Sequence, residues 1–118
     1  MTKYVAPGVH LLIDFWGAKH LENQAYIKKV LKKAADACDA TVLKIILHSF
    51  GEGSGITGVA VLAESHISIH TWPEIKYIAL DVFVCGTGDP HKALPVFRDF
   101  FEPKKVKVTE YFRGKKSG

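Results

Sequence analysis

The sequence has few cysteines, no long apolar run and no signal-peptide core, and each shortage argues against a class of protein. The two cysteines, Cys38 and Cys85, show neither CxxC spacing nor the density of a disulfide-rich secreted domain. No stretch approaches the length that spans a bilayer, and the N-terminus lacks the apolar segment of a secretory signal. We therefore expect a cytoplasmic protein with no membrane partner and no metal site.

Positive charge is present but diffuse. The chain has 16 Lys and Arg against 12 Asp and Glu, for a net charge of +4. The excess comes largely from lysines on one predicted helix and from the tail at 113–116. A nucleic-acid-binding protein more often has a denser basic stripe with interleaved aromatic residues. The pattern favours a solvated surface, and we expect no nucleic-acid partner.

The length of 118 residues is enough for one domain, covering 1–118, with a single modest core. Hydrophobic residues make up 47% and charged residues 24%, which is ordinary for a globular protein. We find no internal repeat, low-complexity tract or linker that would divide the chain.

Hydrophobic periodicity predicts the element order β-α-β-β-β-β-α-β. The predicted strands cover 9–16, 41–50, 57–64, 66–72, 76–85 and 106–112, and the predicted helices cover 23–38 and 90–101. Pro73 should end the fourth strand or confine it to a sheet edge. Asp89 with Pro90 should start the second helix, whose first half Pro95 weakens. This order predicts an α+β two-layer sandwich, with two helices on one face of a largely antiparallel sheet.

One face of the predicted sheet carries groups that suit bulk water poorly. In the fourth strand Ile67 and Ile69 share one face, and imidazoles and hydroxyls share the other. If the aliphatic faces meet the helices, the opposite face gathers Ser68, His70, Asp81, Phe83 and Cys85. Such a mixed face is typical of a pocket or a subunit contact. We expect a homodimer whose sheets stack face to face.

The run from Ala63 to Glu74 places two acids, two histidines, three hydroxyl residues and a tryptophan within twelve positions. A serine hydroxyl in such a run can attack its own upstream carbonyl. The ester then eliminates the carboxylate, and the dehydroalanine that remains hydrolyses to a pyruvoyl group. This chemistry needs a hydroxyl, an oxyanion donor and a base. Ser65 and His70 are candidates for the hydroxyl and the base, although a Ser–His pair alone is common.

The complete pattern resembles the prokaryotic short-chain S-adenosylmethionine decarboxylases, which depend on a pyruvoyl group. The likeness rests on Glu-Ser-His-x-x-x-His-Thr-Trp-Pro-Glu at 64–74 and Phe-x-Cys-Gly at 83–86, and it extends over nearly the whole chain. It implies self-cleavage between Glu64 and Ser65 into a β chain of 1–64 and an α chain of 65–118. Ser65 would become the pyruvoyl cofactor that takes up the amine of S-adenosylmethionine. Glu64 precedes the cut and has no assigned catalytic role.

The same resemblance implies roles for individual side chains. His70 matches the histidine that accepts a proton during self-processing, and Cys85 matches the thiol that reprotonates the substrate carbon after decarboxylation. Thr57 matches a hydroxyl position that assists processing. Glu74 matches the acid that binds the ribose hydroxyls, and Phe50 resembles the aromatic residue that stacks on adenine.

The remaining candidates receive structural interpretations. Cys38 lies on the apolar face of the first predicted helix and should be an inert core thiol. Trp16 and Trp72 are expected to be core or interface aromatics rather than ligand contacts.

Two other functions stay open. Some relatives of the family act on arginine or ornithine instead, with the same pyruvoyl machinery. A non-enzymatic α+β module that binds a small ligand or RNA would have the same element order and an intact chain. The leading expectation is decarboxylation of S-adenosylmethionine, which supplies the aminopropyl donor for spermidine synthesis.

Overall fold

The fold was analysed on a computed structural model that describes residues 8–63, 65–85 and 88–114. Glu64 and Gly86, which belong to the sequence motifs, lie outside the described residues. The strands are β1 (Gly8–Trp16), β2 (Val42–Ser49), β3 (Ile56–Leu62), β4 (Ser65–Trp72), β5 (Tyr77–Cys85) and β6 (Lys105–Arg113). The helices are α1 (Gln24–Ala37) and α2 (Ala93–Phe101), with short 3₁₀ turns η1 (Pro73–Ile75) and η2 (Pro90–Lys92).

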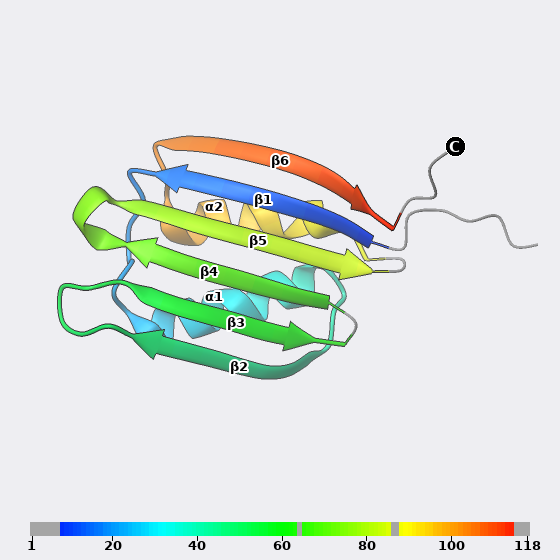
Figure 1. Ribbon diagram of the computed structural model, residues 1–118, viewed down its shortest axis with the longest axis horizontal. Coiled ribbons are helices and arrows are strands. Elements are labelled where there is room, and N and C mark those ends of the chain that lie inside the picture. The colour runs from blue at the N-terminus through cyan, green and yellow to red at the C-terminus, as the bar shows by residue number, and fades with distance from the viewer. Residues whose placement is uncertain (1–7, 64, 86–87, 115–118) are drawn as a thin grey trace, which may run out of the picture.

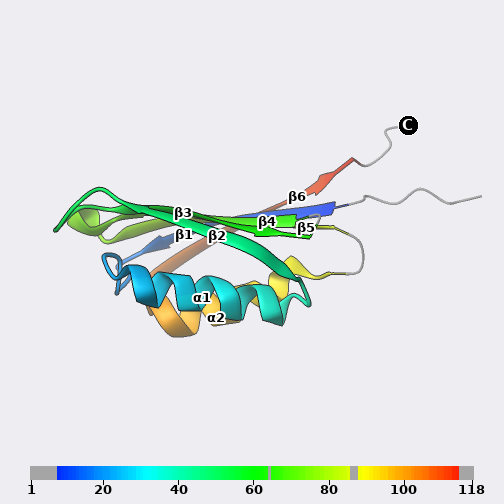
Figure 2. The same cartoon turned by 90° about the horizontal axis from the view of Figure 1, so that it is seen from below.

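The strands form one sheet in the order β2-β3-β4-β5-β1-β6, and every neighbouring pair is antiparallel. Figure 1 shows this order across the sheet, and Figure 2 shows both helices on the same side of it. The predicted α+β two-layer sandwich is therefore confirmed, as is the predicted order of its strands and helices. Within the described residues, no helix is long and apolar enough to cross a membrane.

Helix α1 forms where the sequence combines a cap with a 3.6-residue apolar period. The Asn23 side chain accepts a hydrogen bond from the backbone N–H of Tyr26 and so satisfies one of the free donors at the helix start. The buried stripe consists of Ile27, Val30, Leu31, Ala34 and Ala35. The lysines between these positions are exposed, so the helix presents only its apolar stripe to the sheet.

The second predicted helix is divided where the sequence has its prolines. Asp89 accepts a hydrogen bond from the His91 N–H at 2.9 Å, but this cap starts the 3₁₀ turn η2, and α2 begins only at Ala93. Pro95 is the third residue of α2. An N–H at that position has no partner within the helix, so the proline removes no hydrogen bond there.

The core lies between the sheet and the two helices. Strand β5 shows the arrangement most clearly, because Ile78, Leu80, Val82 and Val84 are buried while the alternate residues are only partly covered. Burial of each such side chain stabilises the fold by about 1.5–3 kcal/mol. The opposite side of the sheet, which we call the free face, is covered by neither α1 nor α2 (Figure 2). As predicted, it carries Ser68, His70, Asp81, Phe83 and Cys85.

Candidate active site

Ser65 and Cys85 meet at one end of the sheet. Ser65 is the first residue of β4 and Cys85 is the last residue of the antiparallel neighbour β5, so the register brings them together. The Cys85 backbone N–H donates a hydrogen bond to Ser65 Oγ at 3.2 Å. Both residues are half-buried. This end of the sheet therefore brings together the Ser65 hydroxyl, the Cys85 side chain with its thiol, and the Cys85 backbone N–H.

Thr57 and His70 form a second pair nearer the other end of β4. They are register partners on β3 and β4, and Thr57 Oγ1 lies 3.2 Å from His70 Nδ1. The buried hydroxyl of Thr71 fixes this region, since it accepts from the Ile56 N–H at 2.9 Å and donates to the Leu21 carbonyl at 2.7 Å. Thr71 thereby links the start of β3 to the end of β4 and fixes the relative positions of Thr57 and His70.

A surface pocket of about 400 Å³ opens beside this second pair. Its lining includes the four sequence-predicted residues Phe50, Thr57, His70 and Glu74, together with Trp72. The Phe50 ring is 64% exposed and is therefore free to meet a ligand. The wall is closely packed behind it, because a Cβ on Gly55 would lie 1.9 Å from the Thr71 carbonyl oxygen. Only glycine fits at that position.

The two groups of residues do not meet within one chain. His70 lies five positions after Ser65 on β4, a distance of about 17 Å at 3.3 Å per residue. They also differ in strand parity, so their side chains leave β4 toward opposite faces. A single protomer thus holds a Ser65–Cys85 end and a Thr57–His70 end that are complementary in chemistry but distant in space.

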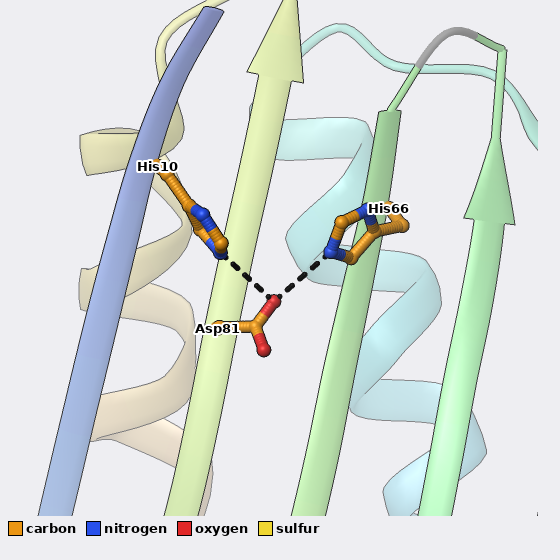
Figure 3. Close-up of side chains that lie close together, drawn as sticks. All are labelled: His10, His66 and Asp81. Carbon is orange, nitrogen blue, oxygen red and sulfur yellow. Dashed lines mark hydrogen bonds and ion pairs between the residues drawn. The ribbon is translucent and has the colours of Figure 1, made fainter. Parts of the chain in front are cut away.

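A third cluster, not assigned from the sequence, lies on the free face near the Ser65 end. Asp81 Oδ1 accepts a hydrogen bond from His66 Nε2 at 3.1 Å and lies 3.3 Å from His10 Nε2, as Figure 3 shows. Asp81 Oδ2 accepts from Ser68 Oγ at 2.6 Å. The sequence signal was weak because the residues are far apart along the chain. They meet because His10 and His66 both pair with Phe83, from opposite sides of β5.

His10, His66 and Asp81 are also residue types that bind zinc, with donor atoms within 4.8 Å of one another. However, Arg113 Nη1 lies 3.2 Å from His10 Nδ1 and can only donate, so the His10 proton resides on Nε2. That nitrogen lies 3.3 Å from Asp81 Oδ1, is buried and makes no hydrogen bond to any residue that the structure describes, and its proton would have to leave before it could ligate a metal.

A row of aromatic rings lies on the free face beside the pocket. Trp72 and Tyr77 have ring centroids 5.2 Å apart, and Trp16 lies 5.7 Å from Tyr77 on the other side. Burial, with a hydrogen bond from the Tyr77 hydroxyl to Asp14, raises the pKa of Tyr77 to about 12. Trp72 is 39% exposed and lines the pocket, so it is not a core residue of the protomer, and the expectation of an interface role stays a prediction.

The two cysteines should differ sharply in reactivity. Burial is the main reason that the pKa of the Cys38 thiol is raised to about 11, so only about one in a thousand is ionised at pH 8. Cys85 is half-buried beside Ser65. We expect iodoacetamide at pH 8 to label Cys85 and leave Cys38 unmodified in the folded protein, as measured by peptide mass spectrometry. Labelling of Cys38 at a comparable rate would contradict its placement in the core.

Comparisons with known proteins identify the family. Residues 9–114 match the family model for S-adenosylmethionine decarboxylase. The chain is 48% identical over 110 residues to a Methanococcus aeolicus protein named S-adenosylmethionine decarboxylase proenzyme, covering 91% of this chain and 93% of the relative. A Thermomicrobium roseum protein with the same name is 36% identical, again covering 91% and 93%.

A solved structure gives the same result for the fold. The crystal structure of the adenosylmethionine decarboxylase from Aquifex aeolicus superposes with a TM-score of 0.84 at 30% identity, covering 95% of this chain and 94% of that one. Sequence and fold thus agree over almost the entire length, including both ends of the candidate site. The chain belongs to the S-adenosylmethionine decarboxylase family.

Proposed function

We propose that this protein is a pyruvoyl-dependent S-adenosylmethionine decarboxylase that makes its cofactor by cutting itself between Glu64 and Ser65. The observation that carries the proposal is the contact between Ser65 Oγ and the Cys85 N–H, which joins the cofactor precursor to the proton donor. The proenzyme names of the relatives support a chain that matures by processing. The product would be the aminopropyl donor for spermidine synthesis.

Self-processing uses the serine hydroxyl as an internal nucleophile. Ser65 Oγ attacks the carbonyl of residue 64, and the peptide bond is replaced by an ester. Removal of the Ser65 α-proton then expels the carboxylate of residue 64, which keeps the serine oxygen. The remaining dehydroalanine takes up water and loses ammonia, and a pyruvoyl group is left at the N-terminus of the α chain. His70 of the second protomer in the dimer proposed below is the base in these reaction steps. Thr57 Oγ1, 3.2 Å from His70 Nδ1, holds the imidazole ring in position.

The residues around position 65 suit a carbonyl cofactor. The Cys85 N–H that donates to the serine oxygen is a backbone donor available to a polar group at that site. When present, a pyruvoyl group binds the substrate amine and withdraws electrons from the bond to the departing carbon dioxide. Cys85 then donates its thiol proton to the substrate carbon, because it is the half-buried acid adjacent to position 65.

The pocket at the other end of β4 favours a nucleoside substrate over arginine or ornithine. The exposed Phe50 ring offers a stacking surface for adenine, and the Glu74 carboxylate can accept hydrogen bonds from both ribose hydroxyls. The aromatic contribution matters most, because neither arginine nor ornithine carries an aromatic base to stack on Phe50.

A homodimer would complete the active site. The free face bears large apolar side chains that are exposed in the protomer, namely Leu12, Ile46, Val61, Trp72 and Tyr111. Stacked sheets lie about 10 Å apart, which is within reach of side chains from both faces. Cys85 lies on the free face, so a two-fold axis perpendicular to β4 would bring the His70 end of one protomer over the Ser65–Cys85 end of its partner. Residue 65 starts β4 in phase with the buried Ile67, so it must turn toward the free face to meet His70. This arrangement joins residues that one chain holds about 17 Å apart.

Release of labelled carbon dioxide from carboxyl-labelled substrates tests the activity. We expect release from S-adenosylmethionine and at least about a hundredfold lower kcat/KM for arginine and ornithine, since neither fills the adenosine pocket. Phe50→Ala should raise the KM for S-adenosylmethionine about 10-fold and leave self-cleavage intact. Activity on arginine without activity on S-adenosylmethionine would overturn the substrate assignment.

A further inference from the structure

Asp81 connects β5 to the part of β4 that immediately follows the proposed cut. It lies on the free face four residues before Cys85, with its two carboxylate oxygens turned to different donors. His66 Nε2 donates to one oxygen at 3.1 Å, and Ser68 Oγ donates to the other at 2.6 Å. Figure 3 shows Asp81 between His66 on one side and His10 on the other. Both β4 donors therefore lie within three residues of Ser65.

Processing removes two attachments of residue 65, the first residue of this segment. Before the cut, residue 65 is joined through residues 63 and 64 to β3, and its hydroxyl accepts from the Cys85 N–H. Cleavage breaks the connection to residue 64. The serine oxygen leaves in the new carboxylate, so the hydroxyl contact is lost as well. What remains at the start of β4 is the backbone ladder, which is weakest at a strand terminus, the buried side chain of Ile67, the contact of the His66 ring with Phe83, and the hydrogen bonds to Asp81.

We propose that Asp81 is a positioning residue that holds the new N-terminus of the α chain against β5 after cleavage. The inference rests on the proposed function, because it requires the cut before residue 65. A carboxylate that accepts from His66 and Ser68 fixes two same-face positions of one strand. Residue 65 then stays beside Cys85, whose thiol must lie close to the reacting carbon. His10, 3.3 Å from Asp81, limits how far the carboxylate can rotate.

The proposal predicts that Asp81 contributes more after the cut than before it. A purely structural role would destabilise β4 equally in both states. The comparison needs four proteins: the wild type, Asp81→Ala, Ser65→Ala and the double variant Ser65→Ala/Asp81→Ala. The two proteins that carry Ser65→Ala cannot be cut, and they report the effect of Asp81 on the intact hairpin.

Hydrogen–deuterium exchange of amides 65–69 is the primary readout, with intact mass used to verify cleavage. We expect Asp81→Ala to speed exchange at least about 10-fold in the cut protein and less than about 3-fold in the uncut background. If Asp81→Ala does not fold, Asp81→Asn and Ser65→Ala/Asp81→Asn replace the pair, because asparagine preserves the shape and one acceptor. We then expect the same ordering with smaller ratios.

Kinetics give a second readout. In the cut Asp81→Ala protein we expect kcat to fall about 10- to 100-fold while KM changes less than about 3-fold, since Asp81 is not among the residues that line the pocket of Phe50 and Glu74. The matched control is Glu110→Gln, which removes a carboxylate on β6 that contacts His91 of η2. It should have wild-type exchange at 65–69 and wild-type kcat.

Each outcome separates this inference from the proposed function. Equal exchange ratios in cut and uncut proteins would overturn the role of Asp81 and leave the decarboxylase intact. Failure of a folded Asp81 variant to be cut would place its role before cleavage and would also contradict the inference. An uncut wild-type chain would overturn both.

Discussion

Ser65→Ala should leave the protein as one uncut chain with no measurable decarboxylation. Alanine has no hydroxyl to attack the carbonyl of residue 64, so no ester and no cofactor form. We expect activity to fall by at least about ten-thousand-fold, as for loss of a covalent catalyst. Intact mass spectrometry and carbon dioxide release measure the two effects on the same sample.

The fold should survive this substitution. Ser65 Oγ makes one hydrogen bond to a backbone N–H at the end of a strand, so its loss should cost about 1 kcal/mol of stability. Ser49→Ala in β2 is the matched control, since it removes a serine that accepts one hydrogen bond from a backbone N–H, that of Gly51, and that does not line the pocket. It should be cut and active. Cleavage of Ser65→Ala at the same position would show that the Ser65 hydroxyl is not the nucleophile.

Co-expression of two inactive variants should restore activity if two protomers complete each site. Ser65→Ala damages one end of β4 and His70→Ala damages the other, about 17 Å away in the same chain. In a mixed dimer, one of the two sites then receives an intact Ser65 end from one chain and an intact His70 end from the other. Random pairing should make about a quarter of all sites complete. The measurement is the cut fraction and the decarboxylase activity relative to wild type.

The control uses two variants at the same end. Ser65 and Cys85 touch within one protomer, so Ser65→Ala with Cys85→Ala leaves every site with one defect. This pair should give no recovery of decarboxylase activity. Equal recovery from both pairs would argue for exchange or repair unrelated to the dimer, and no recovery from either pair would contradict the shared site.

Much of the fold could be predicted because each element has an unambiguous local pattern. Strand β5 alternates strictly, and α1 has both its cap and its apolar stripe. The error came at residues 90–92, where Asp89 and Pro90 signal a helix start. Those two signals are satisfied equally well by a 3₁₀ turn, and local sequence cannot separate one tight turn from the start of an α-helix.

The candidate site was predictable in its residues but not in its arrangement. The motif gave Ser65, His70 and Cys85, yet only the strand register shows that Ser65 joins Cys85 and His70 joins Thr57. The alternation of side chains along β5 was enough to predict that Asp81 lies on the free face. Its contacts with His10 and His66 depend on which strands flank β5, a property of topology that strand alternation does not encode.

Intact-mass analysis of the purified wild-type protein tests the central claim most directly. The account predicts two species, residues 1–64 and residues 65–118, with the second lighter by one ammonia than a fragment that begins with serine. That deficit is the signature of a pyruvoyl terminus made from Ser65. A single intact chain of 118 residues in an active preparation, or a second fragment that retains its serine, would contradict it.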